Sequence, residues 1–406
     1  MLMRNALLGV AVACVLVSGC GDDGCSGNGC GGSAGTAGTG GSAGTAGTGG
    51  SAGNGGSGGV TEIDLQVEDY IAALDRPWDI AWLPNGTVLV TERAGRLNVY
   101  VDGAASAPTV ITLDDVVSTG GEGGLMGLEV DPDFNDNGYV YVCTASNAGG
   151  DNDVRVVRLT MSRPNAASVE GRLDIVTGMP HNDGSNGRHS GCRPRFGPDD
   201  VLWVGTGDAA FGSTPQDDDS LGGKVLRVTR GGNAAEGNPE GRLWYSKGHR
   251  NIQGMAFRSD GIGMSAEHGP TIDDEINALV EGNFGWDPVP GYNESVPMTD
   301  LVKFPDAIEA AWSTGSPTLA YGGATFIEGS QWGNWDGVLA VATLKASHLH
   351  VYDVDSEGNL TDRGEFVGDE SRLRSARQGP DGLLYITTDR HPEGDRVLRV
   401  TPIPAD

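Results

Sequence analysis

The chain has 406 residues, and its 55 Asp and Glu residues outnumber 27 Lys and Arg, which gives a formal net charge of −28 at neutral pH. This charge argues against binding to nucleic acid, whose phosphates are held by Lys and Arg, and against adsorption to anionic lipid. Residues 21–59 lack Leu, Ile, Val, Met and every aromatic residue. A hydrophobic core is therefore expected only in the part of the chain that follows.

The first nineteen residues are typical of a secretory signal. Arg4 provides the positive charge, and residues 6–17 form an apolar stretch too short to span a bilayer. The following Val17-Ser18-Gly19-Cys20 resembles a bacterial lipobox, in which the Cys becomes the lipidated first residue. We therefore expect residues 1–19 to be removed, and the protein to be an exported lipoprotein of the periplasm, outer membrane or cell surface. Cys20 would carry its only membrane contact.

Residues 20–60 form the predicted linker. They are mostly Gly, Ser, Ala and Thr, and one nonapeptide occurs at 33–41 and again at 42–50. A random coil of this length reaches roughly 35 Å. The segment is expected to be a flexible tether between the lipid and one folded domain over residues 61–406.

The folded part repeats one pattern, a turn of Pro, Asp, Asn and Gly residues followed by an apolar strand. Pro presets φ, Asp and Asn bond their own backbone, and Gly adopts positive φ, so each turn favours a hairpin. The repeats are about 45–75 residues apart, which suits four-stranded units closed into an all-β propeller. Short helices are expected only at 274–281 and 299–312. The predicted strands cover residues 87–91, 139–142, 201–204, 262–265, 338–341 and 383–386.

Two cysteines, Cys143 and Cys192, fall in the folded part. In an exported protein such a pair forms either a disulfide or two buried free thiols. The sequence leaves both alternatives open.

Two segments carry a family resemblance. Residues 77–86 read PWDIAWLPNG and are followed by Thr91-Glu92-Arg93, and residues 121–128 read GEGGLMGL. Together with later segments in the same order, they resemble the glucose/sorbosone dehydrogenase family over residues 70–402. The resemblance implies a six-bladed β-propeller that oxidises sugars with pyrroloquinoline quinone (PQQ) and Ca²⁺. It also implies a substrate-binding role for Glu122.

The predicted catalytic residues are His189, Asp208 and Arg250. The segment HSGCR at 189–193 is similar to the one that bears the family's catalytic base, and Asp208 matches the residue that orients this base. A His suits the removal of a hydroxyl proton near neutral pH. Arg250 is expected to stabilise negative charge on the quinone oxygen as hydride arrives. Cys192 and Pro194 stand where the family usually has Gly and Leu.

The predicted cofactor-binding residues are largely cationic, as a rigid tricarboxylate requires. The segment GHRNIQG at 248–254 is close to the family's most distinctive one, in which Arg and Asn contact the quinone carbonyls. Ser375 replaces an Asp that is common in the family. The full predicted set is Arg250, Asn251, Gln253, His268, Thr318, Lys345, Arg372 and Arg374.

Two calcium sites are implied by the same resemblance. The carbonyl oxygens of Gly269 and Pro270 would bind the ion that holds PQQ. The carboxylate of Glu275 and the carbonyl of Phe284 would bind a second, structural ion. Calcium prefers several oxygen ligands, and a main-chain ligand tolerates Phe284 in place of the family's Tyr.

The predicted function is oxidation of an aldose at C1 to its lactone, with electrons passed to an acceptor such as a cytochrome or a quinone. No glycine-rich dinucleotide fingerprint is evident. Two alternatives remain open. One is a calcium-dependent propeller lactonase, which would not need the cationic residues. The other is a binding propeller that has lost its cofactor, which the departures at Cys192 and Pro194 leave possible.

Overall fold

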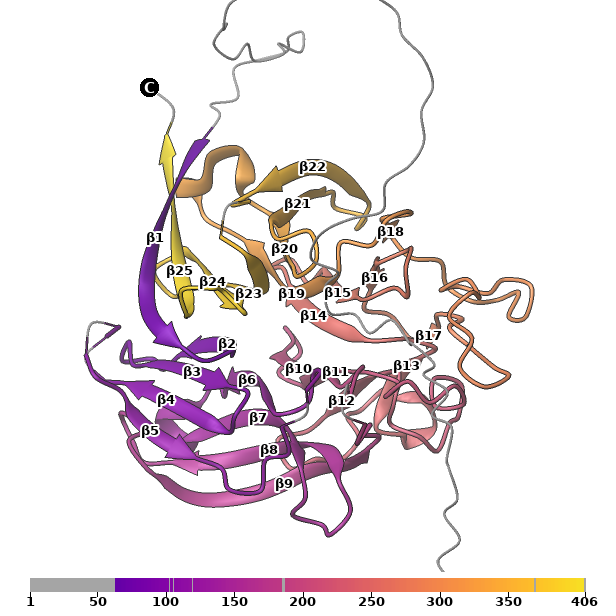
Figure 1. Ribbon diagram of the computed structural model, residues 1–406, viewed down its shortest axis with the longest axis horizontal. Coiled ribbons are helices and arrows are strands. Elements are labelled where there is room, and N and C mark those ends of the chain that lie inside the picture. Colours follow the sequence, from indigo (N-terminus) through magenta and orange to yellow (C-terminus); the bar gives the residue numbers. More distant parts are fainter. Residues whose placement is uncertain are drawn as a thin grey trace, which may run out of the picture. The chain divides into compact units, whose positions relative to one another are not determined.

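The structure, a computed structural model, describes residues 63–404 except 102, 105, 119, 185, 186 and 369. These residues form six β-sheets arranged around one axis (Figure 1). The predicted signal peptide, lipobox and linker lie outside the described residues, which begin with the first strand of the domain. None of the helices in the described part of the chain has the length and apolar composition needed to cross a bilayer.

The sheets are numbered here as blades 1 to 6. Blade 1 contains β2 (Pro77–Trp82), β3 (Val88–Glu92), β4 (Arg96–Tyr100) and β5 (Thr109–Thr112). Blade 2 contains β6 (Leu125–Val130), β7 (Tyr139–Ser146), β8 (Asp153–Met161) and β9 (Val169–Met179). Blade 3 contains β10 (Gly191–Phe196), β11 (Leu202–Thr206), β12 (Lys224–Val228), β13 (Trp244–Lys247) and a short parallel strand, β17 (Gly282–Asn283).

Blade 4 contains β14 (Ile252–Phe257), β15 (Gly263–Glu267), β16 (Glu275–Ala278) and β18 (Trp312–Ser313). Blade 5 contains β19 (Tyr321–Ile327), β20 (Val338–Thr343), β21 (Leu349–Val354) and β22 (Leu360–Phe366). Blade 6 contains β23 (Arg372–Gln378), β24 (Leu384–Asp389), β25 (Asp395–Pro404) and β1 (Ile63–Leu74). The helical pieces in the described residues are α1 (Phe134–Asn137) and the 3₁₀ turns η1 (Pro239–Gly241) and η2 (Ser330–Trp335).

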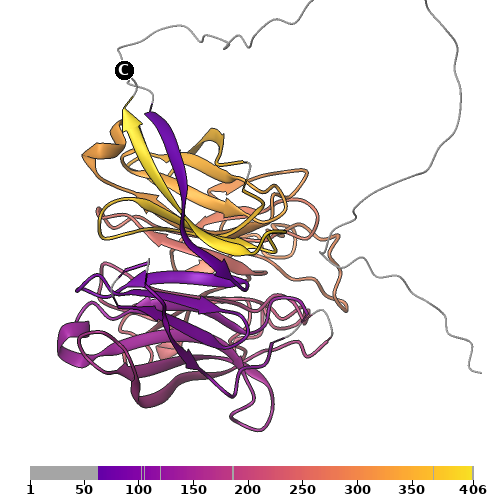
Figure 2. The same ribbon diagram turned by 60° about the vertical axis from the view of Figure 1, so that its left-hand side comes forward.

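The first strands of the six blades form a closed ring. β2 contacts β6, β6 contacts β10, and the contacts continue through β14, β19 and β23 back to β2. Blade 6 is closed by β1, which pairs antiparallel with β25 from Ile63 opposite Pro404 to Leu74 opposite Asp395, and the two strands lie side by side in Figure 2. The expected six-bladed all-β propeller is confirmed, and its closure leaves few exposed strand edges.

The six strands predicted from the turn pattern are the second strands of the six blades: β3, β7, β11, β15, β20 and β24. The first turn shows why the pattern works. The Leu83 N–H donates to the carbonyl of Thr87, and the Gly86 N–H donates to the carbonyl of Leu83. Gly86 has φ of +87°. The turn therefore reverses the chain between β2 and β3, whose residues are almost all buried.

The two helix predictions are wrong. Residues 275–278 form β16, in which Ile276 enters the core while Glu275 and Asn277 face Glu267. This alternation has the period of a strand, and pairing with β15 satisfies the backbone. Residues 299–311 are loop and turn, and β18 begins at Trp312.

Buried charges tie the inner strands together. Asp79 on β2 accepts Arg193 at 2.7 Å and Arg195 at 3.0 Å, both from β10. Glu129 on β6 accepts Arg377 from β23 at 2.8 Å. Burial alone would raise the pKa of Asp79, but the surrounding guanidinium groups hold it well below its usual range. Removing one partner would leave an uncompensated buried charge, so the blades are held in one arrangement.

The two departures near the predicted base are accommodated at β10. Cys192 forms a disulfide with Cys143 of β7, with Cα atoms 5.6 Å apart, so the structure joins blades 2 and 3 covalently. Pro194 lies on a strand with one unpaired edge, because β10 is the innermost strand of its sheet, and Pro is tolerated at such an edge. Gly127 lets β6 lie close to Pro194, since a Cβ at residue 127 would lie 2.4 Å from the Pro194 ring.

Candidate active site

His189 and Asp208 lie at the ends of neighbouring strands, His189 just before β10 and Asp208 just after β11. Their side chains meet, with His189 Nδ1 2.7 Å from Asp208 Oδ1. The main chains cross closely here, because a Cβ on Gly207 would lie 1.9 Å from the carbonyl oxygen of His189. His189 itself has φ of +59°. The structure therefore brings the predicted pair together. The close crossing of the main chains explains why residue 207 is Gly.

Asp208 fixes the tautomer of His189. Burial would raise the pKa of Asp208, but His189, Arg250 and Trp286 together lower it. An ionised carboxylate only accepts hydrogen bonds, so Nδ1 of His189 carries the hydrogen and Nε2 keeps its lone pair. Nε2 is buried and has no partner among the residues that the structure describes. The pKa of His189 is lowered by burial and by Arg250, against the opposing effect of Asp208. The unpartnered nitrogen is thus a neutral proton acceptor.

Tyr292 and Trp286 complete this group. The Tyr292 hydroxyl donates to Asp208 Oδ2 at 2.8 Å and lies 2.9 Å from His189 Nδ1, and Trp286 Nε1 donates to Asp208 Oδ2 at 2.8 Å. Burial and Asp208 raise the pKa of Tyr292, so its hydroxyl stays protonated. Asp208 is therefore held by three side-chain donors and by the Ala210 backbone N–H.

Arg250 is fully buried and lies beside the base. Its Nη1 donates to the carbonyl of His268 at 2.7 Å, and its Nη2 donates to Glu294 at 2.6 Å. Glu294 is one-third exposed and also lies 3.4 Å from Arg188. The predicted cofactor-binding guanidinium thus faces a carboxylate that the sequence analysis did not identify. His268 contributes its main chain to this contact.

Glu122 joins two of the predicted cofactor-binding amides. Its carboxylate accepts Asn251 Nδ2 at 3.0 Å and Gln253 Nε2 at 3.1 Å, and the Ser190 backbone N–H at 2.9 Å. The carboxylate therefore links the β10 entry beside His189 to β14. Glu122, predicted to bind substrate, thus contacts the residue that follows His189.

The late cationic pair converges on one acid. Asp389 accepts Arg374 at 3.1 Å and Arg372 at 3.4 Å. Burial would raise the pKa of Asp389, but these arginines lower it to about 2. Arg374 also lies 4.2 Å from the centre of the Trp78 ring and 3.4 Å from Gln253. It thereby connects blade 6 to the amides of blade 4.

Lys345 and Thr318 lie together beside the predicted calcium loop. The exposed Lys345 ammonium donates to Thr318 Oγ1 at 3.2 Å, and Thr318 N donates to the carbonyl of Thr271. Because Thr271 follows Gly269-Pro270, the two predicted cofactor contacts adjoin that loop. Through the main chain of His268, which accepts a hydrogen bond from Arg250, the loop is also linked to that guanidinium.

The Gly269-Pro270 loop is pinned by Asp274. The carboxylate of Asp274 accepts Gly269 N at 2.8 Å and the backbone N–H groups of Leu319 and Ala320, each at 2.6 Å. A Cβ on Gly269 would lie 2.2 Å from the Ile272 carbonyl oxygen. The loop therefore gathers main-chain oxygens in a small space, which is the type of ligand that Ca²⁺ uses.

Glu275 lies directly opposite Glu267 in the pairing of β15 and β16. Burial and Glu267 raise the pKa of Glu275 well above its ordinary value. Asn277 donates to both carboxylates, and its own Oδ1 is buried without a partner among the described residues. Two facing acids and an unused amide oxygen fit a bound cation. Phe284 lies nearby, with its ring 4.5 Å from that of His249, which contacts Glu267.

Four residues of this site were not predicted from the sequence. Trp286 ends the segment NFGW at 283–286, which contains the predicted ligand Phe284, so a signal was present. Tyr292 and Glu294 lie in a loop outside the segments that resemble the family, and Asp389 ends β24. Only the tertiary structure brings these three to the predicted residues.

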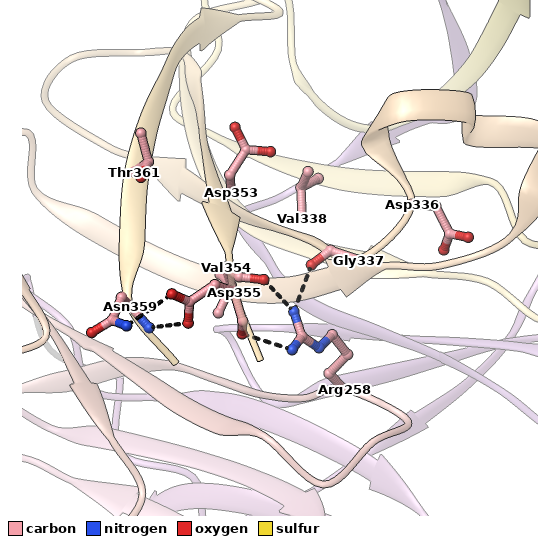
Figure 3. A pocket seen from close by; sticks show the side chains of 9 residues that line it. All are labelled: Arg258, Asp336, Gly337, Val338, Asp353, Val354, Asp355, Asn359 and Thr361. Carbon is pink, nitrogen blue, oxygen red and sulfur yellow. Dashed lines mark hydrogen bonds between the residues drawn. The ribbon is translucent and has the colours of Figure 1, made fainter. Parts of the chain in front are cut away.

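A separate cavity of about 220 Å³ lies between blades 4 and 5 (Figure 3). Arg258 crosses it and donates to the carbonyl oxygens of Gly337, Val354 and Asp355. None of the predicted site residues lines it. This cavity therefore lies where two blades meet and is not part of the candidate active site.

A comparison with protein-family models decides the affiliation. The family described as Glucose / Sorbosone dehydrogenase matches residues 74–399. The chain belongs to this family. The resemblance seen in the sequence is thereby confirmed over residues 74–399.

Two curated relatives are similar over most of the chain. Aldose sugar dehydrogenase YliI of Escherichia coli is 31% identical, covering 81% of this chain and 91% of the relative. Quinoprotein glucose dehydrogenase B of Acinetobacter calcoaceticus is 26% identical, covering 79% and 84%. Among solved structures, the PQQ-bound form of the aldose sugar dehydrogenase from Streptomyces coelicolor is 28% identical with a TM-score of 0.69, covering 84% of this chain and 99% of that one.

Proposed function

We propose that the protein oxidises an aldose at C1 to its lactone, with PQQ and Ca²⁺ as cofactors. One observation carries the proposal: the buried pair of His189 and Asp208 presents a neutral Nε2, without a partner in the described part of the chain, beside the buried guanidinium of Arg250. A hydride-removing oxidation of an alcohol requires such a base for the hydroxyl proton.

The residues around this pair fit a tricarboxylate cofactor. Arg250 Nε and Arg374 Nε are buried without a partner among the described residues, and Lys345 is exposed beside Thr318. These three cations would hold the carboxylates and the quinone oxygens, with Arg372 beside Arg374. PQQ, when bound, supplies the two-electron acceptor that the side chains lack.

Each side chain then has a defined task. His189 Nε2 accepts the proton of the C1 hydroxyl, while Asp208 orients the ring and stabilises the positive charge that develops on it. Tyr292 and Trp286 hold Asp208 in place. Arg250 stabilises negative charge on the oxygen that faces it. Glu122, held by Asn251 and Gln253, presents a carboxylate that suits sugar hydroxyls.

Calcium is proposed at the two predicted positions. The Gly269-Pro270 loop would hold the ion next to the cofactor, supported by Asp274. Glu275, the Asn277 amide oxygen and the Phe284 carbonyl would hold the structural ion. A cation there would offset the repulsion between Glu275 and Glu267. The electrons would leave to a cytochrome or a quinone.

The test is reconstitution of protein produced without PQQ. PQQ with Ca²⁺ should give dye-linked oxidation of at least one aldose and a change in the absorbance of PQQ, and chelation before reconstitution should prevent both. PQQ binding without oxidation would indicate a binding propeller. Lactone hydrolysis without PQQ would indicate the lactonase. Oxidation with a nicotinamide and no PQQ would overturn the proposal outright.

A further inference from the structure

We propose that blade 5 carries a second kind of metal site, for a divalent transition-metal ion such as Zn²⁺, formed by His348, His350 and Glu365. Each residue offers one ligand atom, and these atoms all lie within 4.8 Å of one another. Imidazole and carboxylate together are ligands that Zn²⁺ favours, whereas the proposed calcium sites use oxygen alone. The residues belong to β21, its preceding turn and β22, and none has a part in the proposed oxidation.

The strand geometry places the three side chains on one face. His348 and His350 are two residues apart, so they point to the same side, and His350 lies directly opposite Glu365. A bulge at Arg363 interrupts the pairing, with Val351 opposite Gly364 and Tyr352 opposite Asp362. Without the extra residue, the side chains at 362 and 365 would face opposite sides of the sheet.

This bulge lets Asp362 orient His350. Asp362 Oδ1 lies 2.8 Å from His350 Nε2 and also accepts Gly364 N at 2.8 Å. The ring of His350 stacks on Tyr352, with centroids 4.8 Å apart. A carboxylate that accepts from Nε2 leaves Nδ1 of His350 with its lone pair, which is the usual arrangement behind a metal-bound His.

His348 brings its nitrogen to the same place. Its Nε2 lies 3.2 Å from His350 Nδ1. Two imidazole nitrogens bound to one tetrahedral Zn²⁺ at about 2.0–2.1 Å are roughly 3.3 Å apart. The main chain of His348 is fixed, because its N and its O both bond the Thr343 hydroxyl. The histidines therefore already stand at ligand spacing.

The site is open on one side. Both His side chains are buried, whereas the side chain of Glu365 is 65% exposed. An ion can thus enter past Glu365 on the outermost strand of the blade, and water can take the fourth position. The alternative is a hydrogen-bonded chain from His348 through His350 to Asp362 that binds no ion.

A bound ion would join β21 to β22. It would act on the folded state, because the three ligands converge only after the strands pair with the bulge in register. Its binding should therefore raise the unfolding temperature, by an amount that grows with the logarithm of the ion concentration above its Kd. Neither PQQ nor turnover enters this expectation, so it can fail or succeed independently of the proposed function.

The experiment is titration of chelator-treated full-length protein with ZnCl₂ in excess Ca²⁺, followed by calorimetry and thermal unfolding. One Zn²⁺ per chain is expected, with a rise in unfolding temperature. His350→Gln and the exposed variant Glu365→Gln should weaken this binding at least tenfold, and Asp362→Asn about 10–100-fold, as for a residue that orients a ligand. His391→Gln should bind as the unaltered protein does.

Co²⁺ supplies an independent readout. Bound Co²⁺ should give visible d–d absorption in the unaltered protein and in His391→Gln. It should give none in His350→Gln. No Zn²⁺ binding in excess Ca²⁺, or binding that survives equally in Glu365→Gln and His350→Gln, would overturn the proposal. Glu365→Gln lies at the surface and should fold normally, so it decides the matter even where His350→Gln does not fold.

Discussion

His189 combines two properties that a general base needs. It is buried, so its proton-accepting nitrogen is shielded from water, and its ring is fixed by Asp208 at 2.7 Å. Because Asp208 is in turn held by Tyr292 and Trp286, the ring has little freedom to rotate. Such a support confines the lone pair to one direction.

Replacing His189 by Gln should leave PQQ binding intact while turnover collapses. The cations that would hold the cofactor remain, whereas a positioned base contributes about 10²–10⁴-fold. The loss should appear in kcat and not only in KM, in reconstituted enzyme. Tyr292→Phe, which removes one donor to Asp208, should lose less. Near-normal kcat in His189→Gln with PQQ bound would show that another base acts.

On the acid side of the pH profile, activity should be lost at a pH below the ordinary pKa of His. Burial and Arg250 lower the pKa of His189 from 6.5, so the neutral base persists to lower pH than usual. The decline of kcat/KM at acid pH should therefore have its midpoint below pH 6.5. Asp208 opposes the lowering, so Asp208→Asn should move the midpoint further down. A midpoint above 6.5 in the unaltered enzyme would contradict this assignment.

Glu294 should compete with the cofactor for Arg250. Its carboxylate lies 2.6 Å from Arg250 Nη2. Glu294→Gln keeps the shape and removes the charge, so the PQQ concentration for half-maximal reconstitution should fall about two- to fivefold, the scale of a partly exposed ion pair. Asp300→Asn, an exchange elsewhere in the same loop, is the control. Weaker PQQ binding in Glu294→Gln would show that the carboxylate assists the cofactor.

At the scale of elements, Asp274 holds the proposed calcium loop against blade 5. It accepts three backbone N–H groups from two segments. Asp274→Ala should raise the Ca²⁺ concentration needed for reconstitution about 10–100-fold, as when a ligand's support is lost. It should also lower the unfolding temperature, because buried donors lose their acceptor. Asp273→Asn, one residue away, should change the Ca²⁺ requirement little. Equal Ca²⁺ requirements in both variants would mean that the loop does not bind the ion.

The same element shows why turn chemistry is readable and loop conformation is not. Gly and Pro restrict φ locally, so the turns before β3 or β24 follow from a few adjacent residues. Residues 274–281 gave no such signal. Their extended form depends on pairing with β15, which is a contact made by other residues.

For the whole molecule, the propeller is closed by β1 and β25, from opposite ends of the folded chain. The predicted tether precedes β1, so a lipid at Cys20 would anchor the domain through this blade. Cys20→Ser should release the protein from membranes in its host, or leave its signal unprocessed, since the thioether and acyl chains cannot form. Fractionation of cells and mass measurement of the N-terminus test this. Membrane association that persists in Cys20→Ser would refute the lipobox.

The amino-acid sequence by itself determined the alternation of strands and turns, the propeller fold and the positions that match the family's motifs. These rest on local signals, such as turns, alternating burial and short segments around His189 and Arg250. It could not pair Cys143 with Cys192 or place Tyr292, Glu294 and Asp389 at the base and the arginines. It also gave no hint of the His348, His350 and Glu365 cluster. Those contacts join residues from different blades, loops or strands, and they exist only because the closed ring and a bulge fix which side chains meet.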